Sequence, residues 1–138
     1  MLSELLIVAM LAAAGQNALD SGQQALRAGD LAQAEQFFRQ YLAQNPNSAE
    51  ALSNLGAVCS RREQFSEAVK WYEKALKADP KLIPVHFNLG IALGQLKEFR
   101  KAAEHFRAFL ETYPNEPRAH QLLGLALLET GDLRGTLA

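Results

Sequence analysis

Apolar and polar positions between residues 49 and 82 follow two helical stripes, one after the other. The first stripe has the three- and four-residue spacing of an amphipathic helix: Ala51, Leu52, Leu55, Val58 and Cys59. Polar residues at 61–64 interrupt this pattern. A second stripe of similar spacing then follows: Phe65, Ala68, Val69, Tyr72, Ala75 and Leu76. The stretch therefore predicts two helices joined by a short turn.

The ends of the helices carry their own signals. Ser48 precedes the first helix, and its hydroxyl can accept a hydrogen bond from a backbone N–H that the helix leaves free. Pro80 pushes Asp79 out of helical geometry, which ends the second helix. In the preceding unit Gly29 is suited to end a helix and Asp30 to cap the next one, and residues 129–132 repeat this turn.

The two-helix pattern recurs along the chain with a period of 34 residues. Four residue types keep this interval: Gly22, Gly56, Gly90 and Gly124; Pro46, Pro80 and Pro114; Leu42, Leu76 and Leu110; Ala34, Ala68 and Ala102. A fixed period of about 20–50 residues is typical of repeat architectures. We therefore predict an all-α solenoid of stacked helix pairs.

The periodic glycines predict close contacts between helices, because glycine inside a helix costs roughly 0.5–1 kcal/mol relative to alanine. We expect each glycine to allow a neighbouring helix to approach closely. The expected facing residues are the periodic alanines, with the aromatic residues beyond them filling the wider gap: Phe38, Tyr72 and Phe106.

These residues resemble the tetratricopeptide repeat family, whose 34-residue motif is W-x2-L-G-x2-Y, then A-x3-F, then P. Leu55-Gly56, Ala68-x3-Tyr72 and Pro80 match it, as do their equivalents at 89–114. The tryptophan position departs from the motif and holds Ala18, Leu52, His86 and His120. The tyrosine position also departs and holds Ala25, Cys59, Leu93 and Leu127. The resemblance implies a right-handed α-solenoid of antiparallel helix pairs, with full repeats at 15–48, 49–82 and 83–116 and a partial fourth at 117–138.

The resemblance also implies a non-catalytic protein-interaction module whose first helices line a concave groove. The groove residues predicted to bind a peptide or partner segment are Leu19, Gln23, Asn54, Phe87, Asn88, Ile91, Arg118 and Leu122. An asparagine amide can bond both the N–H and the C=O of a peptide backbone. Phe87 and Ile91 form an apolar pocket in this interpretation; alternatively, they pack between repeats.

One subtype of the family clamps a C-terminal carboxylate with lysine, asparagine and arginine side chains. Leu19, Ser53 and Pro84 stand here where the basic groups of that clamp belong. We therefore predict no binding of chaperone tails of that kind.

Composition and motifs exclude several other classes. The net charge is −1, and no basic run is longer than two residues, as in Arg61-Arg62, so no basic stripe is available to neutralise nucleic-acid phosphates. No nucleophile elbow, phosphate loop, cysteine pair or zinc-protease motif occurs. We predict no enzyme, no cofactor and no metal. The expected separation of His86 and His120, about 10 Å, is too long for one metal ion, and His105 fills an interface.

Residues 1–14 support two interpretations. Residues 5–14 are ten consecutive apolar residues, which is short of the roughly 20 needed to cross a bilayer. That length and Ala12–Ala14 are typical of a signal peptide, although no Lys or Arg precedes the run and Glu4 does. The alternative is a capping helix on the first repeat. A cleaved signal would place the protein in the bacterial periplasm or outside the cell; a cap would leave it in the cytoplasm.

The last predicted helix is apolar on almost every side: Leu122, Leu123, Leu125, Leu127 and Leu128. Such a helix needs cover on more than one side. Either the chain is a piece of a longer one or another subunit covers this surface. The second functional hypothesis is therefore a structural assembly element that self-associates through the Leu122–Leu128 helix.

Overall fold

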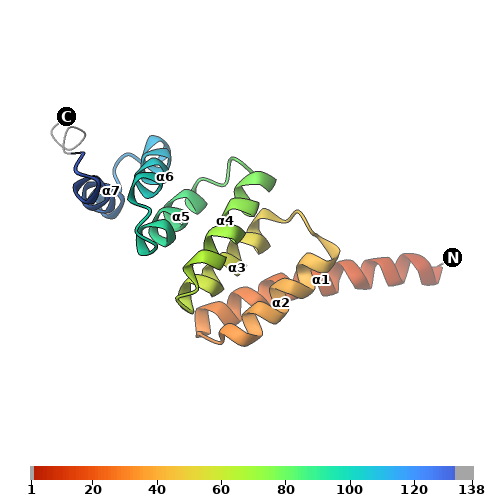
Figure 1. The fold of residues 1–138 in the computed structure, drawn as a ribbon. Coiled ribbons are helices and arrows are strands. Elements are labelled where there is room, and N and C mark those ends of the chain that lie inside the picture. The colour runs from red at the N-terminus through yellow and green to blue at the C-terminus, as the bar shows by residue number, and fades with distance from the viewer. Residues whose placement is uncertain (1, 133–138) are drawn as a thin grey trace.

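The structure, a computed structural model, describes the backbone of residues 2–132 and the side chains of residues 3–10 and 17–132. This part of the chain forms seven α-helices and no strand (Figure 1). The helices are α1 (Leu2–Ala28), α2 (Leu31–Gln44), α3 (Ala49–Arg61), α4 (Phe65–Ala78), α5 (Pro84–Gln95), α6 (Phe99–Thr112) and α7 (Pro117–Thr130). The predicted all-α architecture is confirmed.

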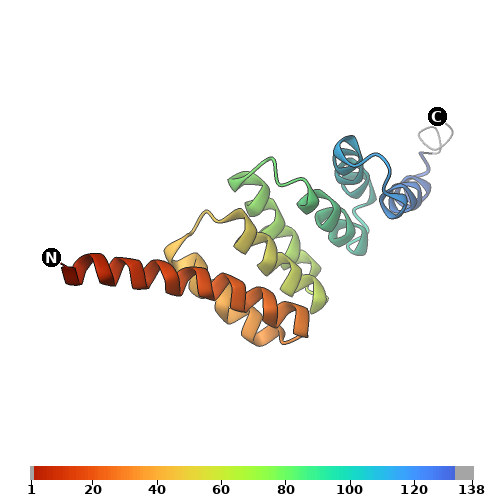
Figure 2. The same cartoon turned by 180° about the vertical axis from the view of Figure 1, so that it is seen from behind.

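The helices pack as successive pairs in a solenoid, and each helix contacts only helices of its own or a neighbouring pair. The pairs are α1 with α2, α3 with α4, and α5 with α6; α7 packs on α6 and α5. Figures 1 and 2 show that α1 and α7 lie at opposite ends of this row. The core is therefore a line of small clusters between helices rather than one central cluster.

The turns follow the sequence signals. Asp30 accepts a hydrogen bond from the backbone N–H of Gln33, and Ser48 accepts one from that of Ala51. Gly29 and Gly131 adopt positive φ, as expected of residues that end a helix. The sequence did not reveal that the equivalent residues of the two middle repeats are not glycine yet adopt the same left-handed conformation: Glu63 (φ 59°) and Lys97 (φ 61°).

The periodic glycines do allow close approach, but the aromatic rings rather than the alanines lie over them. A methyl group added to Gly22 would lie 2.6 Å from the Phe38 ring. At Gly56 it would lie 2.5 Å from Tyr72. At Gly90 it would lie 2.7 Å from Phe106. The predicted pairing of glycine with alanine was therefore wrong. The three rings are almost fully buried, and each occupies the space that a side chain at the glycine would otherwise fill.

Gly124, the fourth glycine of the series, differs from the other three. No described atom lies within 4 Å of the position that its added methyl group would occupy. The ring that would follow the series belongs to a second helix of the fourth repeat, and the described part of the chain ends at residue 132. Leu125 and Leu128, on the same helix, are 52% and 58% exposed.

Helix α1 runs without a break across the predicted boundary between residues 14 and 15. The large apolar side chains at its beginning, from Leu5 to Val8 and at Met10, are all more than half exposed. The described side chains of this stretch therefore cover none of the repeat core. Within residues 2–132 no helix has the length and hydropathy required to span a bilayer.

Candidate partner-binding surfaces

The first helices of successive repeats, α1, α3, α5 and α7, touch one another in order along the molecule. We refer to the surface that they form as the first-helix face. It carries the side chains predicted to bind a partner, with one exception. Leu19 is 5% exposed and packs in the core cluster of Phe38, Ala51 and Leu55. Its side chain stabilises the contact between the first two repeats and is not available to a partner.

Two predicted residues are amides on adjacent helices. The Gln23 side chain donates a hydrogen bond of 2.6 Å to the carboxylate of Glu50, which ties α1 to α3. The Asn54 amide nitrogen on α3 is buried and has no hydrogen-bond partner within the described part of the chain. An unsatisfied buried donor costs about 1–3 kcal/mol, so this amide lowers the stability of the free chain.

The structure brings Phe87 and Asn88 into one hollow of about 380 Å³ where α5, α6 and the start of α7 meet. Phe109, Tyr113 and Glu116 complete its walls together with Pro84. The Arg118 guanidinium lies 5.6 Å from the centre of the Phe87 ring, so a cation also borders this place. We refer to this site as the Phe87 hollow. The sequence did not identify Phe109 and Tyr113 as part of it.

The remaining predicted residues are partly buried. Phe87 packs against Phe106 and Phe109, with ring centroids 6.0 and 5.1 Å apart. Ile91 and Leu122 pack against the central core cluster. The two interpretations of Phe87 are therefore compatible: one side of the ring packs between helices, and another lines the hollow.

The groups capable of chemistry are few. Burial raises the pKa of the Cys59 thiol, and the charge of Glu35 raises it further, so the thiol stays protonated. The described residues hold no cluster of three or more His, Cys, Asp or Glu side chains that could hold a metal ion.

His86 and His105, which the sequence did not pair, lie together between α5 and α6. Their Nδ1 atoms are 2.9 Å apart and their rings are stacked. Burial lowers the pKa of both side chains, and the charge of His86 lowers that of His105 further. The hydrogen bond between these two nitrogens requires one to donate and the other to accept. The contact therefore cannot persist when both rings are protonated on both nitrogens.

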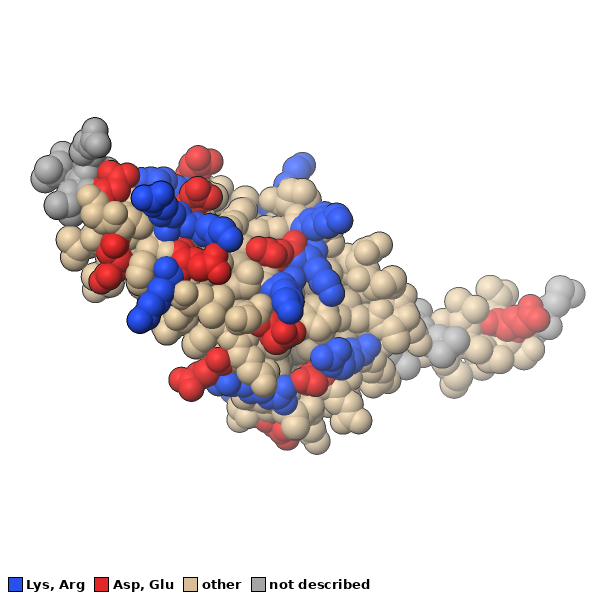
Figure 3. Space-filling view, in the orientation of Figure 1, with Lys and Arg blue, Asp and Glu red and all other residues tan. Residues whose placement is uncertain are grey.

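Charges of both signs alternate over the repeats on the face shown in Figure 3, whereas the projecting part of α1 is nearly uncharged. Glu4 is the only charged residue among the first sixteen. No extended stripe of one sign is seen on this face.

Two family models, both described as tetratricopeptide repeat, match residues 19–83 and 61–125. Together they span residues 19–125, from within α1 to within α7. Comparison with curated proteins gave no match.

Solved structures of similar fold include domains of three different proteins. MamA from Desulfovibrio magneticus RS-1 is 24% identical with a TM-score of 0.82, over 88% of this chain and 68% of that one. The O-GlcNAc transferase of Thermobaculum terrenum is 28% identical with a TM-score of 0.77, over 85% of this chain and 22% of the transferase. The TPR2B domain of yeast Sti1, in a complex with pHsp70, is 21% identical with a TM-score of 0.77, over 84% of this chain and 98% of the domain.

Proposed function

Because the chain belongs to the tetratricopeptide repeat family, we propose that it is a non-catalytic interaction module that holds a peptide or partner segment on its first-helix face. Among similar folds, the Sti1 domain was solved in a complex with pHsp70, which supports a role in binding proteins. The Phe87 hollow carries the proposal for this chain, because it joins an aromatic wall, the exposed amide of Asn88 and a nearby cation.

Each group has a separate task in this proposal. The Phe87 ring contacts an apolar side chain of the partner, since a ring buried on one side and open on the other loses little entropy on binding. Asn88 bonds the partner backbone through its amide. Asn54, one repeat earlier, supplies a second amide whose nitrogen lacks an acceptor. Arg118 attracts an acidic or C-terminal group.

Selection of peptides from a random display library on the purified chain tests this proposal. Asn88→Ala and Arg118→Ala are the informative variants, because Phe87→Glu would also disturb the packing against Phe106 and Phe109. We expect each variant to weaken the selected peptides about tenfold or more. The matched control is Gln40→Ala, which removes an exposed amide from the second helix α2. Peptides that bind all variants equally would refute the proposed site.

A second candidate function is assembly through α7, and it is favoured by the open position beside Gly124 and by exposed Leu125 and Leu128. In this case a second copy covers the helix. Sedimentation of the purified chain over a range of concentrations tests it. Leu125→Glu with Leu128→Glu should abolish association, and a chain that is monomeric at the highest concentration removes this candidate.

A further inference from the structure

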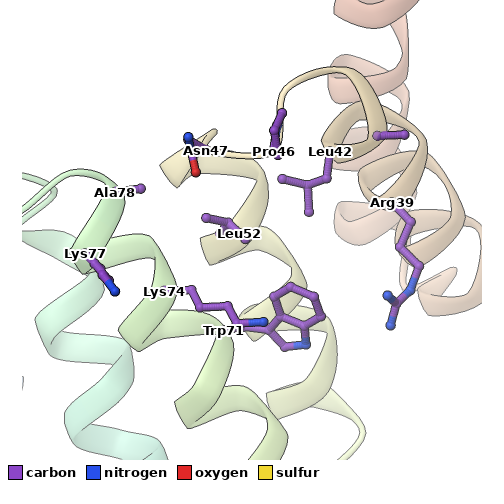
Figure 4. Close-up of a pocket in the computed structure, with 10 residues that line it drawn as sticks. Arg39, Leu42, Pro46, Asn47, Leu52, Trp71, Lys74, Lys77 and Ala78 are labelled. Carbon is purple, nitrogen blue, oxygen red and sulfur yellow. The ribbon is translucent and has the colours of Figure 1, made fainter.

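A second hollow lies away from the first-helix face, between the second helices of the first two repeats. It has a volume of about 750 Å³ and is bounded by α2, α4, the connection before α3 and the buried side chain of Leu52 (Figure 4). No Cα atoms of α2 and α4 come within 8 Å of each other, which leaves the space open. Trp71 stands at its centre in Figure 4, with Leu42 and Pro46 on the side of α2. We refer to this site as the Trp71 hollow.

The charged groups that line this hollow are all cations: Arg39, Lys74 and Lys77. Arg39 and Lys74 both lie over the indole of Trp71, at 5.5 and 4.7 Å from the ring centre. This arrangement holds the two cations at the wall of the hollow.

Of the three cations, Arg39 pairs with an acidic residue, Glu35, which Arg62 also engages. Glu35 meets Arg62 at 2.5 Å through one carboxylate oxygen and Arg39 at 3.4 Å through the other. Within the described part of the chain neither Lys74 nor Lys77 forms an ion pair. The lining of the hollow therefore contains three cations and no acidic residue, although the whole chain has a net charge of −1.

The repeat register provides an internal comparison, because the same positions recur 34 residues later between α4 and α6. Arg39 and Lys77 correspond to Glu73 and Glu111, and Lys74 corresponds to Ala108. Trp71 corresponds to His105, which there contacts His86 at the position of Leu52. The three positions that hold cations in the first two repeats therefore hold two acidic residues and an alanine one repeat later. The cationic lining is a property of the first two repeats and not of the repeat pattern.

We propose that the Trp71 hollow binds an acidic segment of a partner protein, in which carboxylates flank an apolar side chain. The carboxylates would meet Arg39, Lys74 and Lys77, and the apolar side chain would contact Trp71 and Leu42. Its volume lies within the roughly 300–1,000 Å³ of sites that enclose small ligands, so it suits a few residues of such a segment. Tryptophan and arginine are also the residues that most often dominate binding free energy at interfaces.

Trp71 is the only tryptophan of the chain, so its fluorescence reports on this hollow alone. The probe is the blocked peptide Glu-Glu-Leu-Glu-Glu, added to the full chain, with Gln-Gln-Leu-Gln-Gln as the uncharged comparison. We expect a saturable change in emission with the acidic peptide only, and weaker binding as salt is raised from about 0.05 to about 0.5 M. Equal binding of the uncharged peptide would overturn the proposal.

Charge reversals separate a specific site from general attraction. Lys77→Glu, which copies the residue found one repeat later, should weaken the acidic peptide about tenfold or more. Lys70→Glu is the matched control, because Lys70 lies on the same helix outside the hollow and already pairs with Glu67 at 3.1 Å. Circular dichroism confirms that both variants fold, and labelled-peptide anisotropy gives a second reading of the affinity. Equal losses in the two variants, or displacement of the peptide by inorganic phosphate at lower concentration than by free glutamate, would overturn the proposal.

Discussion

The third repeat and α7 carry a glycine in the same register, but among the described residues only the glycine of the third repeat has a ring packed on it. Gly90 lies under Phe106, whereas no described atom fills the space beside Gly124. A glycine in a helix lowers helix stability wherever it occurs, and the seated ring more than offsets that loss. The comparison teaches that periodicity marks where two helices can approach closely, while burial decides whether that approach stabilises the fold.

Removing a seated ring should have the largest effect. Phe106→Ala leaves a cavity over Gly90 and should lower the free energy of unfolding by about 3–5 kcal/mol, as measured by urea denaturation. The matched control is Tyr113→Ala, which removes an exposed ring that lies 5.0 Å from the ring of Phe109 in a tilted arrangement and should cost less than about 1.5 kcal/mol. Similar losses in the two variants would show that the ring packed on Gly90 contributes no more to stability than an exposed ring.

Adding a methyl group to the glycine beneath the ring should have the next largest effect. In Gly90→Ala the new methyl group would lie 2.7 Å from the buried Phe106 ring, which must move, so we expect a loss of about 1–3 kcal/mol despite the better helix propensity of alanine. The double variant with Phe106→Leu should lose less than the sum of the two single losses, because both changes act on one contact. Additive losses would place the strain elsewhere.

Substitutions in the turns should change stability less, and replacing the strained residue should raise it. Lys97 holds the left-handed conformation that Gly131 adopts after α7, and a side chain in that conformation costs about 1 kcal/mol. Lys97→Gly should therefore raise the free energy of unfolding by about 1 kcal/mol in urea denaturation. Gly29→Ala should lower it by a similar amount. No gain from Lys97→Gly would mean that other contacts of this turn relieve the strain.

The open glycine should respond in the opposite way to the seated one. Gly124→Ala meets no described atom, so the helix propensity of alanine should raise stability by about 0.5–1 kcal/mol. Thermal unfolding at low and high protein concentration measures this change. A loss that grows with concentration would show that a second copy occupies the position, in agreement with assembly through α7.

Acid provides a probe of the third repeat alone. The pKa of His86 and that of His105 lie below the value of 6.5 expected in the unfolded chain, mainly because of burial. The unfolded chain therefore binds more protons below pH 6.5, and stability should fall as the pH decreases through that range. Replacing both side chains by those of the preceding repeat, with His86→Leu and His105→Trp, should flatten this dependence. Glu35 has a lowered pKa, so its own contribution is lost only at more acidic pH.

Much of the fold follows from the sequence, because the 34-residue register, the caps at Asp30 and Ser48 and the helix end at Asp79 are all local signals. The register could not predict which side chain of the second helix packs against each glycine. The alanines and the rings share one helix face, and only the packing of the helices decides that Tyr72 rather than Ala68 covers Gly56.

The site was predicted less completely, for the same reason. Phe87, Asn88 and Arg118 do come together, but Leu19 is buried because α1 and α3 close over it. The Trp71 hollow depends on residues of α2 and α4 that do not belong to one helix face, so no periodic pattern in the sequence joins them.

Contacts limited to adjacent helix pairs have a consequence for how the molecule comes apart. Within the described part of the chain α3 contacts helices on both sides, whereas α1 and α7 each contact helices on one side only. Among these helices fraying therefore begins at α1 and α7 and advances inward one helix at a time, and amide protons of α3 exchange with solvent only after their neighbours have opened. A protein that docks against α7 would slow this stepwise opening from that side without touching the middle repeats.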